Sequence, residues 1–345
     1  NNVFSQPENT VENTIIRIRP VIVAYSTWSV HALSAGAVID HREFSSEDSE
    51  TTTDYNLFVA GRLDATRNFQ FTGNVSGGQN TEARYEPAGL GAPEPARNKN
   101  VGADIGASYR SDRLLLQGTV GTRNNDYQNY YAQRDMTETY VGGRVSYAIS
   151  PDVAIFADIR QSDFEYDNSI VNRDGSQTNL RAGVSFELAA PFRGEISAGQ
   201  VTDERDAPGI DDAESFSLDA SVQWFPTQLT TVTFRGFNGI TDPGIPEALS
   251  ANTQRYSLRA DHELLRNVLL FGEFGFGNYE FNAAQGFPLY AREDKFTDAA
   301  LGAAYKLNKH AHLEFGYRMH ATETSGSFNY DTDQNLFSVG VRVFP

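Results

Sequence analysis

The chain has 345 residues and carries 28 Lys and Arg against 45 Asp and Glu, a formal net charge of -17. Duplex nucleic acid is therefore not an expected partner, because proteins bind it by neutralising phosphates with basic side chains. The absence of cysteine excludes disulfide bridges and thiolate metal sites. Mean hydropathy is -0.45, and no apolar run approaches the ~18 residues that a transmembrane helix needs.

The first complete predicted strand begins near Thr14. Pro20 falls inside it and has no N–H group, so this strand needs a bulge or an unpaired position there. Residues 1–4 read as the interior of a longer sequence. We therefore expect Val3-Phe4 to end an incomplete first strand, joined to Thr14 by a loop over residues 5–13. Residues 28–41 are less regular, with mixed side chains on both sides.

Two kinds of connection alternate along the rest of the chain. Short connections are predicted at Ser26-Thr27, Ala65-Thr66, Ser111-Asp112, Ser150-Pro151-Asp152, Ala190-Pro191, Pro226-Thr227, Leu265-Arg266 and Asn308-Lys309. Longer polar loops lie between them, at about 42–53, 83–98, 124–135, 165–176, 203–213, 239–252, 282–293 and 322–333. Short turns on one side and long loops on the other are typical of outer-membrane barrels. A β-propeller also repeats about every 40 residues, but its blades need four short strands each, whereas each period here holds two long ones.

The hairpin at residues 214–235 shows the repeating unit most clearly. Apolar and polar side chains alternate along its first arm, with Phe216, Leu218, Ala220, Val222 and Trp224 on one side and Ser217, Asp219, Ser221 and Gln223 on the other. The apolar set is expected to face lipid and the polar set the lumen. An Arg or Lys on the lipid side would cost about 2–4 kcal/mol near the midplane, so this segregation predicts the orientation.

Aromatic residues recur one to three positions before the short connections. They are Tyr25, Tyr109, Tyr147, Trp224 and Tyr305. The repeated offset predicts an aromatic girdle at the lipid–water interface. The alternative is that aromatic residues are merely common in strands.

Seventeen complete strands can be counted between Thr14 and Phe344. The last strand ends on the short-turn side and the first begins on the long-loop side, so antiparallel closure requires one more crossing. The predicted fold is an all-β, transmembrane, antiparallel up-and-down β-barrel of 18 strands, with 16 as the fallback. It forms a single domain over residues 1–345.

The polar set of side chains predicts what lines the lumen. A barrel of this size keeps an aqueous lumen, so these side chains either line a transport path or form interstrand ion pairs that stiffen the wall. The basic members are Arg17, Arg19, Arg62, Arg110, Arg144, Arg160, Arg181, Arg235, Arg255, Arg259, Arg318 and Arg342. The acidic members are Asp64, Asp104, Asp158, Glu187, Asp219, Asp261, Glu263, Glu273, Asp298 and Glu314.

Two loops have distinctive sequences. Residues 85–95 are rich in Pro and Gly and are expected either to fold into the mouth as a constriction or to stay outside. The other loop is acidic, and its oxygens could bind calcium, although no EF-hand spacing is present and a solvated loop is the simpler interpretation. Its acidic residues are Asp203, Glu204, Asp206, Asp211, Asp212 and Glu214.

Catalytic motifs are weak. The histidines, at positions 31, 41, 262, 310, 312 and 320, form no HExxH motif, and the chain contains no GxSxG. A membrane hydrolase with Ser, His and Asp on separate strands is the enzyme alternative, because triads are defined by geometry. We predict no enzymatic activity and no cofactor, and no metal beyond the weak calcium candidate.

The two ends of the chain resemble a known family. The start Asn1-Asn2-Val3-Phe4, the Pro20 strand at 14–23 and the late strand Asp333-Gln334-Asn335-Leu336-Phe337-Ser338-Val339-Gly340-Val341 are similar to the "putative beta-barrel porin 2" family. The ending Val343-Phe344-Pro345 departs from the pattern, since barrels usually finish on an aromatic residue.

Members of that family are associated with exopolysaccharide export clusters. The resemblance therefore implies a channel in the outer membrane of a Gram-negative bacterium that passes secreted polysaccharide without chemistry of its own. A general porin for small solutes, and a structural or docking barrel plugged by its loops or a partner, are the alternatives. The expected partners are outer-membrane lipid and lipopolysaccharide, together with polysaccharide and periplasmic export proteins.

Overall fold

The described part of the chain forms one antiparallel sheet of eighteen strands. The computed structural model describes residues 2–167, 172–188, 191–206, 212–245, 247–283, 291–326 and 330–344. The strands are β1 (Ile15–Ile18), β2 (Val21–Tyr25), β3 (Ala32–Phe44), β4 (Thr52–Asp64), β5 (Phe69–Thr81), β6 (Arg97–Ser111), β7 (Leu114–Tyr127), β8 (Met136–Ser150), β9 (Val153–Tyr166), β10 (Gly175–Glu187), β11 (Phe192–Arg205), β12 (Ala213–Thr227), β13 (Thr230–Thr241), β14 (Ala248–Leu265), β15 (Val268–Ala283), β16 (Glu293–Asn308), β17 (Ala311–Thr324) and β18 (Thr332–Val343). Two short 3-10 helices, η1 (Asp48–Glu50) and η2 (Asn129–Arg134), lie in connections between strands.

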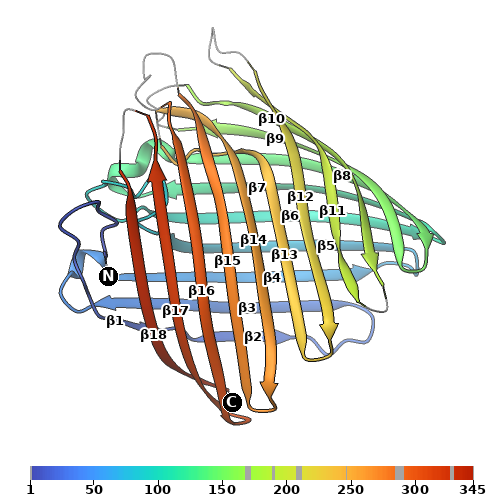
Figure 1. Ribbon diagram of the computed structural model, residues 1–345. Helices are drawn as coiled ribbons and strands as arrows, with labels where there is room; N and C mark the ends of the chain where they lie inside the picture. The colour runs from blue at the N-terminus through green and yellow to red at the C-terminus, as the bar shows by residue number, and fades with distance from the viewer. Residues whose placement is uncertain are drawn as a thin grey trace.

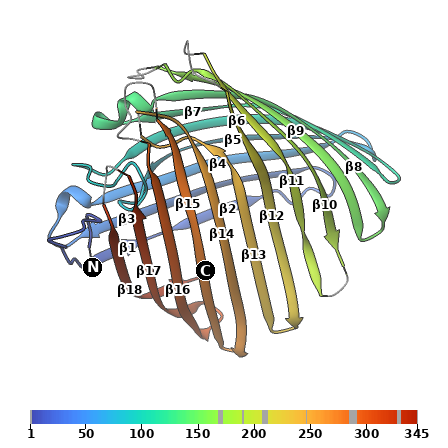
Figure 2. The same ribbon diagram turned by 45° about the horizontal axis from the view of Figure 1, so that its top comes forward.

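Each strand from β2 onward pairs with the next one in the chain. The sheet curls, so that β3, β4 and β5 lie behind β14, β15 and β16 in both views (Figures 1 and 2). The up-and-down order and the antiparallel pairing confirm the predicted fold class. No helix in the described part of the chain is long and apolar enough to cross a membrane.

The first crossing is interrupted at Pro20. Both β1 and β2 pair with β3, in a continuous register in which Ile18 opposes His41 and Val21 opposes Val38. Pro20 donates no hydrogen bond, but its carbonyl still accepts one from the Ile39 N–H at 3.1 Å. The predicted total of 18 strands is confirmed, although it arises differently. The break divides one crossing into two strands, and residues 2–13 contain no strand.

Short turns and long loops collect at opposite ends of the strands (Figure 1). The turns hold as few as two residues between β6 and β7, whereas residues 82–96 separate β5 from β6. The predicted turn at Pro226-Thr227 is displaced, because β12 continues to Thr227 past an irregularity in register after Trp224. The chain reverses at residues 228–229 instead.

The two faces of the sheet differ in the predicted way. On the outer face, apolar side chains such as Val120, Leu258 and Leu301 are 46%, 52% and 62% exposed. On the other face, Arg144 of β8 pairs with Glu195 of β11 at 2.7 Å. Strands three places apart in a flat sheet would be separated by roughly 14 Å, so these side chains meet because their face is concave. The polar face is therefore the lumen side.

The N-terminal segment is tied to the last strand. The Asn2 side chain donates to the Asp333 carbonyl at 2.8 Å, and the Gln334 amide donates to the Asn2 carbonyl at 2.6 Å and to Ser5 Oγ at 2.7 Å. Asn2 and Ser5 are both buried and have positive φ. These contacts join the two ends of the chain at the end of the sheet where the long loops lie.

Val120 and Thr119 are adjacent residues of β7 on opposite faces, and they test the assignment of the faces. We expect Val120→Arg to destabilise the protein by about 2–4 kcal/mol, because it places a charge in lipid. Thr119→Arg is the matched control, since Thr119 opposes Gly106 and Gly142, where the lumen has room. Urea unfolding in lipid vesicles measures both variants. Equal destabilisation would contradict the assignment.

Candidate functional site: a loop constriction in the barrel lumen

The loop over residues 82–96 connects β5 to β6 and folds compactly. Successive backbone hydrogen bonds close tight turns within it, from Glu86 N to Ala83 O at 3.0 Å and from Gly89 N to Glu86 O at 2.8 Å. Gly91 has a φ of +69°, a conformation that favours glycine. The residues rich in Pro and Gly thus form a compact loop made of turns, with no additional β-strand.

Ion pairs hold the base of this loop. Arg84 makes a bidentate pair with Glu50 of η1, with Nε to Oε2 at 2.9 Å, and both side chains are buried. Arg134 of η2 pairs with Glu82 at 2.9 Å, and its guanidinium lies 4.1 Å from the centre of the Tyr127 ring. Burial opposes the charge on Arg134, but the nearby Tyr127 and Glu82 outweigh it and raise its pKa. Loops from three neighbouring hairpins are therefore locked together.

Tyr131 of η2 adds a further attachment. Its hydroxyl donates to the Glu94 carbonyl at 2.7 Å, and the side chain is only 2% exposed. Burial raises the pKa of Tyr131 to about 12, so the phenol remains a donor at any physiological pH.

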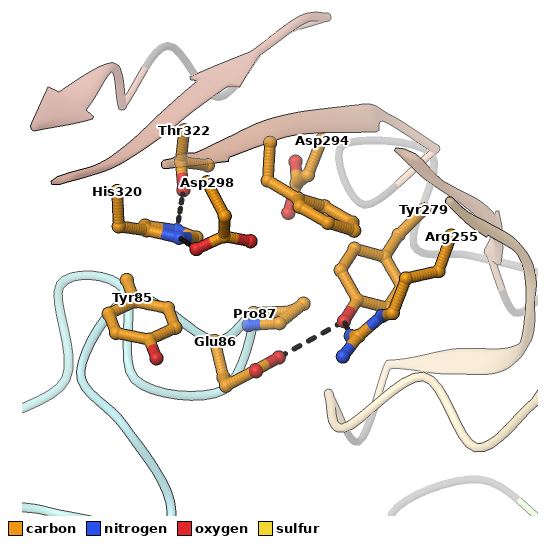
Figure 3. Close-up of a pocket in the computed structure, with 10 residues that line it drawn as sticks. Tyr85, Glu86, Pro87, Arg255, Tyr279, Asp294, Asp298, His320 and Thr322 are labelled. Atoms are coloured by element: carbon orange, nitrogen blue, oxygen red, sulfur yellow. Dashed lines mark hydrogen bonds and ion pairs between the residues drawn. The ribbon is translucent and has the colours of Figure 1, made fainter. Parts of the chain in front are cut away.

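The tip of the loop reaches the opposite wall of the barrel (Figure 3). Tyr85 stacks on His320 of β17, with ring centres 3.8 Å apart, and Glu86 accepts a hydrogen bond from Tyr279 of β15 at 3.1 Å. His320 is held in turn by Asp298 of β16 at 2.8 Å and Thr322 at 3.0 Å. Only the concave side of a curled sheet lets one loop contact such distant strands. The loop therefore crosses the lumen as a constriction, one of the two arrangements considered from its sequence.

Cavities remain on both sides of this loop. A small one of about 80 Å³ lies between the tip and the wall of β14 to β17 (Figure 3). A larger one of about 710 Å³ lies beside the loop. Its lining combines aromatic rings with charges of both signs, including Tyr127, Phe164, Arg123, Arg255, Glu138 and Asp242.

A second loop closes the far side of the larger cavity. Asp242 accepts hydrogen bonds from Arg173 at 2.6 Å, from the Tyr166 hydroxyl at 2.8 Å and from the Gly244 N–H at 2.7 Å. Burial opposes the ionisation of Asp242, but Arg173 and Arg134 outweigh it and lower its pKa to about 2. The carboxylate is thus charged at every pH the envelope meets, and this loop stays attached.

The register places the predicted lumen residues that have a strand partner on the polar face. Many of them form ion pairs there, so the expected interstrand ion pairs are present. Examples between strands are Arg17 with Asp40 at 2.6 Å, Arg160 with Glu138 at 2.7 Å, Arg181 with Asp158 at 3.1 Å and Arg259 with Glu273 at 3.1 Å, while Arg62 with Asp64 at 3.2 Å and Arg259 with Asp261 at 2.8 Å are pairs within one strand.

Four of the five predicted girdle residues lie on the outer face near the short turns. Tyr109, Tyr147, Trp224 and Tyr305 are each roughly half-exposed and oppose Phe69, Leu114, Phe192 and Val268. Tyr25 does not belong with them. It opposes Ser34 in β3, on the face that carries Arg17 and Arg62. Tyr25 is an even number of positions from Arg17, so strand alternation puts both on the lumen side.

The weak calcium candidate gains no support. Asp203 is 1% exposed and pairs with Arg205 at 2.7 Å, while Asp211 lies outside the described residues. No group of three or more His, Asp or Glu side chains in the described ranges is placed to hold a metal ion.

Sequence reasoning missed the residues that fix the loop. Arg84, Glu50, Arg134 and the pair Tyr85 and His320 were not candidates, because they come from different hairpins. The presence of several charged and aromatic residues in a loop rich in Pro and Gly is the one signal that could have drawn attention to them.

Known proteins resemble this chain both in sequence, through a family model, and in fold. The family model described as "Putative beta-barrel porin 2" matches residues 1–344, and no curated protein matches the sequence. The fold is similar to the FrpB iron transporter from Neisseria meningitidis (F3-3 variant), with 6% identity, a TM-score of 0.52, and 94% of this chain and 65% of that chain covered. It is also similar to the copper transporter OprC, with 11% identity, a TM-score of 0.51, and coverage of 97% and 73%.

A third similar structure is the siderophore receptor PirA from Acinetobacter baumannii, with 8% identity, a TM-score of 0.50, and coverage of 98% and 72%. The chain spans less than two thirds of the length of the FrpB transporter. At these identities the likeness concerns the fold alone. The family match over nearly the whole chain goes further: the protein belongs to the "putative beta-barrel porin 2" family and is an outer-membrane β-barrel of a Gram-negative bacterium.

Proposed function

We propose that this barrel is a channel that passes secreted polysaccharide across the outer membrane, without chemistry of its own. The observation that carries the proposal is the loop over residues 82–96, fixed across a polar lumen beside a cavity of about 710 Å³. A sugar ring presents hydroxyl groups at its edge and apolar C–H groups on its faces. The cavity offers hydrogen-bond donors and acceptors for the hydroxyl groups and aromatic rings for the apolar C–H faces.

The family description supports a porin-like channel. The association of similar proteins with exopolysaccharide export, which the sequence resemblance implies, supports polysaccharide as the cargo. The iron and copper transporters with a similar fold carry other cargo by their titles, and at their low identity they do not argue for metal transport here.

A catalytic interpretation is disfavoured by burial. Asp298, His320 and Thr322 form a hydrogen-bonded row in the order acid, base and hydroxyl. Thr322 is only 4% exposed, however, and Tyr85 covers the imidazole ring of His320. A nucleophile must reach its substrate, so in this proposal the row anchors the loop instead.

A general diffusion porin for small solutes is the second candidate. The attachment of Tyr85 and Glu86 to the far wall favours it, because the space between the tip and that wall is only about 80 Å³. Such a constriction would admit small solutes while excluding a polymer unless the tip moves.

Conductance and secretion together test the proposal. We expect the purified protein to conduct in planar bilayers, the polysaccharide of its host to reduce the current from the periplasmic side, and deletion of the gene to abolish secretion. Liposome swelling that falls with solute size, with normal secretion in the deletion strain, would support the diffusion porin instead. A barrel that never conducts, and whose deletion leaves secretion intact, would indicate a structural or docking role.

The loop tip provides a second prediction. Tyr85→Ala combined with Glu86→Ala removes an aromatic stack worth about 0.5–1.5 kcal/mol and a hydrogen bond worth about 1 kcal/mol. The two losses add to about 1.5–2.5 kcal/mol, so we expect single-channel recordings to show a high-conductance state, with the tip released, populated roughly ten- to seventyfold more often. Tyr130→Ala, at a 57% exposed tyrosine of η2, is the control and should leave the recordings unchanged. Identical recordings for the double variant and the wild type would show that the tip does not limit flow.

A further inference from the structure

The arginines of the polar face fall into two groups. Most of them have a carboxylate within ion-pair distance, as Arg144 does with Glu195 at 2.7 Å. Five have no carboxylate partner among the residues that the structure describes, and we call them the free arginines: Arg19, Arg110, Arg235, Arg255 and Arg318. Apart from Arg255, none of them makes a hydrogen bond through its guanidinium in that part of the chain.

The carboxylates of the same face are almost all compensated. Within the described strands, Asp104 and Asp298 alone on this face lack an Arg or Lys partner. Asp104 accepts a hydrogen bond from Asn74 at 3.3 Å, and Asp298 is bound to His320 at 2.8 Å. The net charge of -17 therefore resides mainly on the loops and the outer face, while the uncompensated charge on the lumen face of the strands is mainly positive.

The free arginines occupy several heights along the lumen. Arg110 is one residue from the end of β6 at the short-turn end and lines a recess of about 590 Å³ together with Arg67. Arg235 lies five residues into β13 from the same end. Arg255 opposes Phe237, two residues further along that strand. At about 3.3 Å per residue these positions cover roughly 20 Å along the strands, which is about half of the hydrocarbon thickness once the tilt of the strands is included.

Arg255 is held where passing molecules would meet it. Its guanidinium donates to the Tyr279 hydroxyl and lies 5.1 Å from the centre of the Phe296 ring. It lines both the small cavity at the loop tip and the larger one. Burial raises the pKa of the nearby Tyr85, and Glu86 and Asp298 act in the same direction while Arg318 and Arg255 act against it, so the two arginines lie close to the tip together with these two carboxylates.

From this arrangement we infer that the channel prefers anions and that its polysaccharide is acidic, carrying carboxylates on its sugar rings. The inference rests on the proposed function and adds the substrate class. Arg side chains that project into a pore select anions, and a guanidinium binds a carboxylate through two parallel hydrogen bonds. Tyr279 and Phe296, beside Arg255, supply apolar faces for the ring that bears the carboxylate.

The charges at the two ends of the barrel agree with export of an anionic polymer from the periplasmic side. The connections at the short-turn end contain four basic residues, Arg67, Arg113, Arg266 and Lys309, and two acidic ones, Asp112 and Asp152. In the long loops acidic residues predominate. An anionic chain would be attracted at the basic mouth on the periplasmic side and repelled from the acidic rim after leaving.

The zero-current potential across a planar bilayer tests the ion preference. With a KCl gradient we expect the wild-type protein to favour chloride over potassium, and the triple variant Arg235→Gln, Arg255→Gln, Arg318→Gln to shift the potential toward potassium. Lys99→Gln removes a cation from the outer face and should leave the potential unchanged. A wild-type preference for potassium, or a triple variant identical to the wild type, would overturn the inference.

Block by oligosaccharides tests the substrate class. Oligogalacturonate should block the wild-type channel at about a tenfold lower concentration than dextran oligomers of equal length, a factor that one charge-assisted hydrogen bond supplies. The triple Arg→Gln variant should lose this difference, whereas the matching Arg→Lys variant should keep the chloride preference but bind oligogalacturonate less tightly. Equal block by both oligomers in the wild type would contradict an acidic substrate. If the loop keeps the channel closed, calorimetric titration of the detergent-solubilised protein compares the same two oligomers.

Different outcomes would reject the polysaccharide channel and its preference for an acidic substrate. Loss of secretion on gene deletion without any anion preference would leave the polysaccharide channel standing and reject the acidic substrate. Anion preference with normal secretion would reject polysaccharide export and leave the selectivity standing.

Discussion

A backbone that crosses lipid must satisfy its own hydrogen bonds, and the structure follows from this requirement. Strands can meet it only by pairing with neighbours, so the sheet has to curl, and in each strand every second side chain must tolerate lipid. The polar half of the sequence is thereby confined to the concave face. The ion pair between Arg144 and Glu195, on strands three places apart, is possible because of that curvature.

The same requirement explains why so much of the fold could be predicted. Alternation with period two is a local property, so Phe216, Leu218 and Val222 of β12 could be placed on the outer face without knowing any partner strand. Turn and loop lengths are local as well. Prediction failed where local signals conflict. Val21 and Val23 make β2 apolar on its lumen side, so Tyr25 seemed to continue an apolar face although Arg17 has the same parity. At Pro226 an irregular register moved the turn by two residues.

The constriction could not be predicted to the same extent. Glu86 and Tyr279 are 193 residues apart, and no rule of spacing pairs them. Their contact depends on the curl of the whole sheet and on the base of the loop, where the buried pair of Arg84 and Glu50 sets the direction in which the chain leaves β5. Breaking such a pair by removing one partner is costly, because the other charge stays buried. The buried base is therefore the rigid part of the loop, and the tip, held by one stack and one hydrogen bond, is the part that can release.

The distribution of ion pairs matters more for passage than the total charge. A guanidinium bonded to carboxylates, such as Arg259 with Asp261 and Glu273, attracts a passing anion only weakly, because the carboxylates neutralise its charge. A free arginine keeps its full attraction, and the low-dielectric wall of a barrel strengthens that attraction above its value in bulk water. This protein is acidic as a whole, yet its lumen is lined by compensated pairs interrupted by isolated arginines. Because selectivity depends on the charges that remain uncompensated, the overall acidity of the chain is no argument against an anionic cargo.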